Sequence, residues 1–206
     1  MKKLIYPFLI LLAFGAFNPV SAQKISLKSG SLDFLKGVEI LKLKYSYADM
    51  KVGKFDSEKE YVDKKMETYN AKNPGSGDKW YQSWLEDRQK RFQPKFEQLF
   101  NEILESKKSE LRANEDTDSH YIMIFHTTYT EPGYNIGVSR RNAYIDAEVT
   151  FVKSDDPNNE LARIIIDNSP GREAFGNDYD TGLRIQEAYA KAGKELAYFI
   201  WKQALK

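Results

Sequence analysis

The sequence predicts an α+β domain in which helices pack on one face of a mainly antiparallel sheet of about four strands. Segments with apolar residues at every second position predict strands, and longer segments with apolar residues every three or four positions predict helices. The connections between the last three strands are too short for crossover helices, which favours antiparallel pairing. The predicted order of elements is β-α-α-β-β-β-α.

The first predicted strand is VEILKLKYSY, residues 38–47, because its large apolar residues alternate with lysines and a serine. Residues 24–36 are polar and irregular, and they read as a lead-in to this strand. A helix follows over 58–71. Ser57 precedes Glu60 by three positions, which is the spacing of a capping box.

The breaker NPGSGD, residues 73–78, separates this helix from a longer amphipathic segment over 79–107, for which Asp78 is the predicted cap. Pro94 interrupts that segment, so it is either one helix kinked at Pro94 or two helices broken at Gln93. Trp80 and Trp84 lie off its main apolar stripe and either extend the core or form an exposed aromatic platform. The charged stretch ESKKSELRANEDTDS then predicts a surface loop.

Three period-two segments follow, YIMIFHTTY (121–129), AYIDAEVTFV (143–152) and ELARIIID (160–167), and each predicts a strand. In the second, Ala143, Ile145, Ala147, Val149 and Phe151 share one face. Residues 183–205 repeat apolar side chains at helical spacing and predict an amphipathic C-terminal helix.

The N-terminus has the organisation of a secretory signal peptide. Lys2 and Lys3 precede the short apolar run 4–17, and NPVSA leads to an expected cut after Ala22. We therefore expect a signal peptide over 1–22, one globular domain over 23–206, and a periplasmic or secreted location. The apolar run is short for a membrane span, and no other long apolar run follows it, so no membrane span is expected after cleavage.

Composition excludes several function classes. The chain has 31 basic and 30 acidic residues, so it lacks the basic footprint of a nucleic-acid-binding protein and a polybasic lipid anchor. It has no cysteine and only two histidines, His120 and His126, which strand spacing keeps too far apart for one zinc ion. We expect no metal and no cofactor.

The stretch SPGREAFGNDYDTG, residues 169–182, is rich in glycine and precedes the last helix. It lacks the lysine of a phosphate loop, and Asp178 and Asp180 at the helix start would cap the N–H groups themselves. Arg172 could pair with one of them. The stretch reads as a turn with a cap; a recognition surface or an anion site are the alternatives.

The loop TEPGYNIGVSRRN, residues 130–142, is the second notable segment. Pro132–Gly133 fits a turn with a positive φ at the glycine. Tyr134, Arg140 and Arg141 would then be exposed at one end of the sheet, and these residue types are enriched in binding hot spots. The alternative is a solvated hairpin.

Asp146 and Glu148 share a strand face and are the only carboxylates we single out as weak catalytic candidates. They would act if that face formed a groove; otherwise they form a solvent-facing row.

Several segments together carry a family resemblance: GVEILKLKYSYADMKVGKF, NPGSGDKWYQSWLEDRQKRFQPKFEQLFN, TEPGYNIGVSRRNAYIDAEVTFV and SPGREAFGNDYDTGLRIQEAYAKAGKELA. The chain resembles a group of small secreted proteins of Bacteroidota-type Gram-negative bacteria with no assigned activity. It also looks like periplasmic lipoprotein domains of unknown function related to the N-terminal domain of the Tol-system β-propeller protein, but it lacks their lipidated cysteine. The resemblance implies an envelope location and an α+β fold, and no catalytic residues.

The sequence therefore favours a secreted or periplasmic, non-catalytic binding or assembly module of the cell envelope. Its interaction surface would comprise Tyr134, Arg140, Arg141, Arg172, Asp178 and Asp180, and its partner would be an envelope protein or a second copy of the chain. A glycan- or lipid-binding protein and a carboxylate-dependent hydrolase are the alternative hypotheses.

Overall fold

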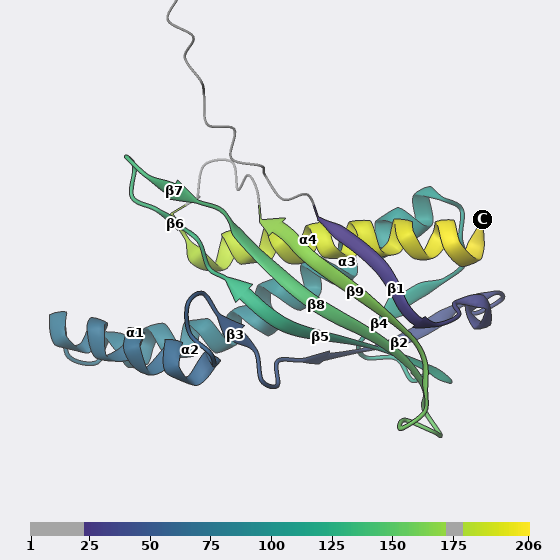
Figure 1. Ribbon diagram of the computed structural model, residues 1–206, viewed down its shortest axis with the longest axis horizontal. Helices are drawn as coiled ribbons and strands as arrows, with labels where there is room; N and C mark the ends of the chain where they lie inside the picture. Colours follow the sequence, from purple (N-terminus) through teal and green to yellow (C-terminus); the bar gives the residue numbers. More distant parts are fainter. Residues whose placement is uncertain (1–22, 172–178) are drawn as a thin grey trace, which may run out of the picture.

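The computed structural model describes residues 23–171 and 179–206 and confirms the α+β class. The sheet is larger than predicted and mixed. It has seven strands in the order β1-β9-β8-β5-β2-β4, with β3 also paired to β5 (Figure 1). The strands are β1 (Lys24–Gly30), β2 (Ile40–Ser46), β3 (Lys51–Val52), β4 (Arg112–Asn114), β5 (Tyr121–Glu131), β8 (Ala143–Lys153) and β9 (Glu160–Gly171).

The predicted antiparallel meander is confirmed for β5, β8 and β9. Phe125 pairs with Val149, and Val149 pairs with Ile164, so one row of apolar side chains crosses the three central strands. All three are fully buried. The alternation in β8 thus turns its apolar face toward the helices.

The expectation of about four antiparallel strands was wrong at both edges of the sheet. β2 pairs in parallel with β5 and β4, because the chain between β2 and β5 makes a long helical excursion that returns it to the same end of the sheet. The polar lead-in contains β1, which pairs antiparallel with β9, and the charged loop contains the three-residue β4.

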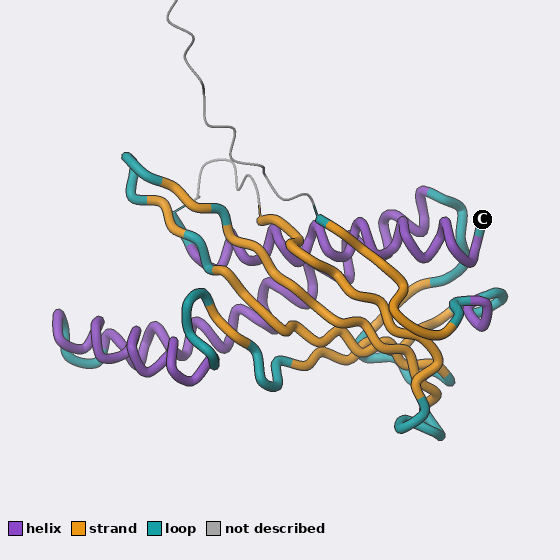
Figure 2. Tube along the Cα trace, in the orientation of Figure 1, coloured by secondary structure: helices purple, strands orange, loops and turns teal. Residues whose placement is uncertain are grey.

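The helical excursion comprises α1 (Glu58–Lys72), α2 (Ser76–Asp87) and α3 (Gln93–Ser106). The Ser57 hydroxyl accepts a hydrogen bond from the Glu60 N–H, which confirms the predicted start of α1. α2 begins at Ser76 after Gly75 in a left-handed conformation, so Asp78 lies in the first turn and is not the cap. α1 and α2 form a hairpin that extends past the sheet (Figures 1 and 2).

The chain runs from α2 into α3 through a π-helical turn, Arg88–Phe92, with no break. The wider turn lies directly before Pro94, which has no N–H to donate to the preceding turn. Trp84 is buried against Tyr61, and Trp80 stacks on it, so this pair extends the core.

The last helix, α4 (Thr181–Ile200), continues as a π-helical turn to Leu205 and confirms the predicted amphipathic segment. α3 and α4 lie along one face of the sheet (Figure 1), with Phe96 of α3 against Phe125 of β5. The two helices approach closely where Gly193 of α4 faces the backbone of Phe96. Within residues 23–171 and 179–206, no helix is long and apolar enough to cross a membrane.

Candidate interaction surface

The segment 130–142 forms an arm that continues the centre of the sheet. β5 and β8 pair as far as Glu131 and Tyr144, and the two-stranded sheet of β6 (Tyr134–Asn135) and β7 (Arg140–Arg141) extends their path. Tyr134 pairs with Arg141, so the arm keeps an antiparallel register almost to its end. Figure 1 shows the arm leaving the body of the domain.

The turn at the end of this arm is closed by its own hydrogen bonds. The Ile136 N–H donates to the Ser139 carbonyl at 3.0 Å, and the Gly137 N–H donates to the Asn135 side-chain oxygen at 2.9 Å. Gly137 has φ 81°, a left-handed conformation that suits glycine. The Tyr134 hydroxyl lies 3.2 Å from the Ser139 hydroxyl. The turn therefore has a defined conformation, and its apolar side chains, Ile136 and Val138, are exposed.

Exposed apolar side chains gather on this arm. Ile136 is 67% exposed and Val138 is 96% exposed. Among the described residues the exposed large hydrophobic side chains are Leu27, Tyr134, Ile136, Val138, Tyr179 and Tyr198. Three of these lie on the arm, and Tyr179 lies just before α4. We call Tyr134, Ile136, Val138, Arg140 and Arg141 the tip surface.

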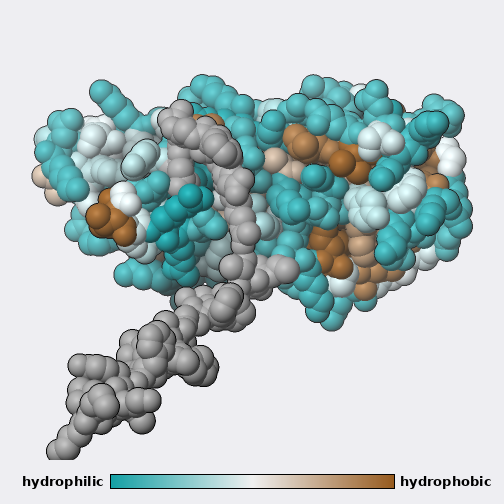
Figure 3. All heavy atoms as spheres, turned by 90° about the horizontal axis from the view of Figure 1, so that it is seen from above, coloured by the Kyte–Doolittle hydropathy of each residue, from teal (hydrophilic) through white to brown (hydrophobic). Residues whose placement is uncertain are grey.

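Figure 3 views the molecule from above. A small brown area stands at its left, at the same horizontal position as the end of the β6–β7 arm in Figure 1, beside strongly hydrophilic atoms. Both arginines of the tip surface are exposed. Exposed apolar side chains and exposed arginines thus lie next to each other on one small protrusion.

The base of the arm is held by two buried charged side chains, Glu131 and Arg184. Among the described residues these are the only charged side chains in the buried set, with 7% and 3% of their surface exposed. The Glu131 carboxylate accepts from the Gly133 N–H at 3.0 Å and pairs with Arg141 at 3.3 Å. The Arg184 guanidinium donates to the carbonyls of Pro132 and Gly133, both at 3.3 Å.

The peptide groups on both sides of Gly133 are therefore fixed by buried charges. The predicted positive φ at Gly133 is confirmed at 62°. A Cβ placed there would meet the Arg141 carbonyl oxygen at 2.4 Å, so only glycine fits this turn. Arg184 also donates to the Thr181 hydroxyl at 2.9 Å, which ties the arm to the first turn of α4.

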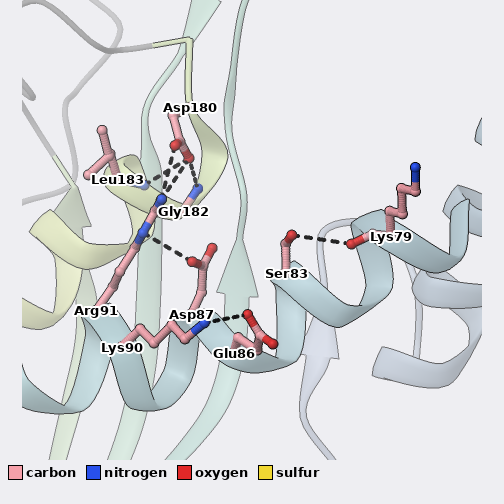
Figure 4. Close-up of polar contacts among 9 residues, drawn as sticks. All are labelled: Lys79, Ser83, Glu86, Asp87, Lys90, Arg91, Asp180, Gly182 and Leu183. Carbon is pink, nitrogen blue, oxygen red and sulfur yellow. Dashed lines mark hydrogen bonds and ion pairs between the residues drawn. The ribbon is translucent and has the colours of Figure 1, made fainter. Parts of the chain in front are cut away.

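The start of α4 is organised by Asp180, as Figure 4 shows. Its carboxylate accepts from the N–H groups of Gly182 at 2.7 Å and Leu183 at 3.2 Å, which confirms Asp180 as the cap. Arg91, from the π-helical turn, donates to both Asp180 oxygens at 3.1 and 3.0 Å. It also pairs with Asp87 at 3.1 Å, so one guanidinium joins two carboxylates.

The two carboxylates respond differently to this environment. Burial raises the pKa of Asp180, but the hydrogen bonds from Arg91, Leu183 and Gly182 outweigh it and hold that pKa below its ordinary value. Burial raises the pKa of Asp87, where the pairing with Arg91 does not fully compensate. The cluster therefore links the end of α2 to the start of α4.

The remaining residues predicted in 169–182 divide into two groups. Arg172 and Asp178 lie outside the described residues. Ser169–Gly171, predicted as the start of the turn, is the last part of β9. A Cβ on Gly171 would lie 2.0 Å from the Arg184 carbonyl oxygen, so this glycine allows β9 to pass close to α4.

The two catalytic candidates lie on the same side of β8, opposite the buried row, and both have structural partners. Asp146 accepts from the Asn168 N–H at 2.6 Å, and Glu148 pairs with Arg163 at 2.9 Å. Burial raises the pKa of Asp146, against the hydrogen bond from Asn168. Across residues 23–171 and 179–206, no group of three or more His, Asp or Glu side chains is placed to hold a metal ion.

Sequence reasoning missed Arg184, Glu131 and Arg91. One partial signal was available for Arg184, because it stands four positions before Ala188 and so borders the apolar stripe of the helix. A charged residue in such a stripe is either at the helix end or buried with partners. Arg91 carries no comparable signal in a segment rich in charged residues.

No protein-family model and no curated protein sequence matches the chain. Among solved structures, a point-substituted PelC dodecamer from Paraburkholderia phytofirmans is similar with a TM-score of 0.38 and 11% identity, covering 90% of this chain and 100% of that chain. A second PelC dodecamer structure from the same organism gives a TM-score of 0.38 and 11% identity, with 89% and 99% covered. At this level of similarity the comparison carries no conclusion about fold or function.

Proposed function

We propose that this protein is a secreted or periplasmic, non-catalytic binding module of the cell envelope, and that the tip surface is its contact site. One observation carries the proposal: exposed apolar side chains concentrate on a protrusion that buried charges hold in place. Contiguous exposed apolar groups on a folded domain are typical of interaction sites. Tyrosine and arginine, which border them here, are enriched at binding hot spots.

The construction of the arm supports a binding role. The arm has a paired register, a closed turn and a base held by buried charged side chains. Pre-organisation of this kind lowers the entropy lost when a partner binds. The partner would be an envelope component or a second copy of the chain.

Photocrosslinking in the producing cell tests this function. Val138 is replaced by a photoreactive amino acid, and Tyr198, an exposed aromatic residue of α4 outside the tip surface, is replaced in a matched control. We expect a discrete adduct at Val138 and none at Tyr198, with the adduct mass identifying a protein or a lipid. No adduct at Val138, or equal labelling at both positions, would overturn the proposal.

A further inference from the structure

We infer that the partner of the tip surface is an anionic phospholipid surface. Ile136 and Val138 enter the boundary between headgroups and acyl chains, and the two arginines contact lipid phosphates. This inference rests on the proposed function, because it assigns a chemical class to the partner of the same site.

The order of residue types along the arm matches the depth profile of a bilayer. The apolar residues form the turn, and Arg140 and Arg141 follow two and three positions after Val138. They form β7, the first paired positions behind the turn, and at the rise of a β-strand they lie about 3 to 7 Å behind it. That distance is comparable to the depth at which interfacial segments place apolar groups below the headgroups.

Two backbone N–H groups at the end of the arm already have hydrogen-bond partners within the turn. An unpaired N–H or C=O is costly in the apolar part of a bilayer. Here the N–H groups of Ile136 and Gly137 both have partners within the turn, and the β6–β7 ladder continues behind them. These two donors therefore keep their hydrogen-bond partners when the turn leaves water.

The exposed charge of the arm is positive. Between residues 131 and 142 the acidic side chain is Glu131 and the basic ones are Arg140 and Arg141. Glu131 is buried and paired with Arg141, whereas both arginines remain exposed. An anionic surface therefore meets guanidinium groups and no exposed carboxylate on the arm, although the chain as a whole is close to neutral.

The size of the tip surface also favours a membrane over a protein partner. A stable protein interface uses roughly 20 to 30 residues on each side. The arm beyond Gly133 presents only the segment 134–141, and a narrow protrusion cannot bury that much area by itself. A lipid surface surrounds such a protrusion from every side.

Vesicle binding tests the inference. The protein is purified from an expressing Gram-negative cell as that cell processes it, and its partition is measured on phosphatidylcholine vesicles with and without phosphatidylglycerol. We expect binding that requires phosphatidylglycerol and weakens as salt increases. The double variant Ile136→Ser/Val138→Ser should bind about a hundredfold more weakly, because two large apolar side chains no longer leave water.

Two further double variants test whether the positive charge of Arg140 and Arg141 contributes to lipid binding. Arg140→Gln/Arg141→Gln should weaken binding about tenfold, and Arg140→Lys/Arg141→Lys should bind like the wild type, because lipid attraction depends on the positive charge. Leu27→Ser/Tyr198→Ser is the matched control for apolar exposure, since both residues are exposed outside the tip surface. It should leave binding unchanged.

The outcomes separate the two proposals. Equal binding to both vesicle types, no binding, or wild-type binding by Ile136→Ser/Val138→Ser overturns the lipid inference. A protein adduct at Val138 without vesicle binding overturns it as well, while leaving the proposed function intact. Absence of both an adduct and vesicle binding overturns both. Thermal melting of each variant checks that it folds. Ile136→Ser/Val138→Ser should melt like the wild type because both residues are exposed, and Arg140→Lys/Arg141→Lys keeps a positive charge beside the buried Glu131.

Discussion

Replacing Arg184 with methionine tests whether a buried guanidinium holds the arm in place. Methionine keeps the length and apolar stem of the side chain and removes its charge and donors. In the native structure those donors reach the carbonyls of Pro132 and Gly133 and the hydroxyl of Thr181. The variant therefore leaves the arm attached by its strands but without its clamp to α4.

The magnitude follows from the geometry. A hydrogen bond from a charged donor contributes about 1.5 to 3 kcal/mol. The two carbonyl contacts measure 3.3 Å, toward the long end of the range, and the contact to Thr181 measures 2.9 Å. The variant no longer carries the free-energy cost of burying a guanidinium, and this offsets part of the loss. We expect Arg184→Met to lower the free energy of unfolding by about 2 to 3 kcal/mol.

Denaturant unfolding measures the loss, and amide hydrogen exchange locates it. The expected pattern is faster exchange at the amides of residues 133–141, with protection retained in the central strands. Arg163→Met is the matched control. Arg163 pairs with Glu148 and Glu160 on the exposed face of the sheet, so its loss should cost about 0 to 1 kcal/mol. Equal stability of the two variants, or a loss at Arg184 without faster exchange in the arm, would refute the clamp.

Three further substitutions test the packing around this site. Gly193→Ala would bring a Cβ to 2.4 Å from the Phe96 carbonyl oxygen. It should therefore lower the free energy of unfolding by about 2 kcal/mol, although alanine favours helix elsewhere. No loss of stability in denaturant unfolding would contradict the close contact between the two helices. Gly133→Ala should cost a similar amount, about 2 kcal/mol, and speed exchange in the arm, because φ is 62° there and the space is filled; unchanged stability and exchange would show that the turn tolerates a side chain. Asp180→Ala removes a cap and an ion pair to Arg91 and should cost about 1 kcal/mol at neutral pH. The pKa of Asp180 is lowered by folding, so its contribution is present above the unfolded pKa and is lost as pH falls through the folded pKa. The stabilities of wild type and Asp180→Ala should therefore converge in acid, and a gap independent of pH would contradict the assigned hydrogen bonds.

The parts of the fold that the sequence predicts are those with a long, regular pattern. The strand alternation of 143–152 and the helical stripe of 183–205 each extend over many residues, so the buried face is encoded locally. The start of α1 was predictable for a different reason, because a capping box is a contact between residues three positions apart.

The missed elements depend on contacts between distant residues. β4 has three residues and β3 has two, which is too short for any alternation to appear. β1 is mostly exposed, so its pairing with β9 leaves little apolar signal. The parallel placement of β2 beside β5 follows from the path of the intervening helices, which no local pattern records.

The same distinction applies to the candidate site. Tyr134, Arg140 and Arg141 were predictable as exposed because turn residues surround them. The features that make the arm a defined structure were not predictable. Glu131 falls in the segment predicted as a loop although it ends β5, and Arg184 contacts the arm from a helix 52 positions after Pro132.

The two buried charges bear on whether the arm has a function. Burying a carboxylate or a guanidinium is expensive, and an apolar core of similar shape is often at least as stable. Among the described residues, Glu131 and Arg184 are the charged side chains that become buried, and both contact the peptide groups of Gly133 at the base of the arm. Arg184 joins the base of the arm to the first turn of α4, and Glu131 joins it to β7 through Arg141. Two buried charges at the base of one protrusion, with exposed apolar side chains at its end, therefore support the proposal that this end is the contact site.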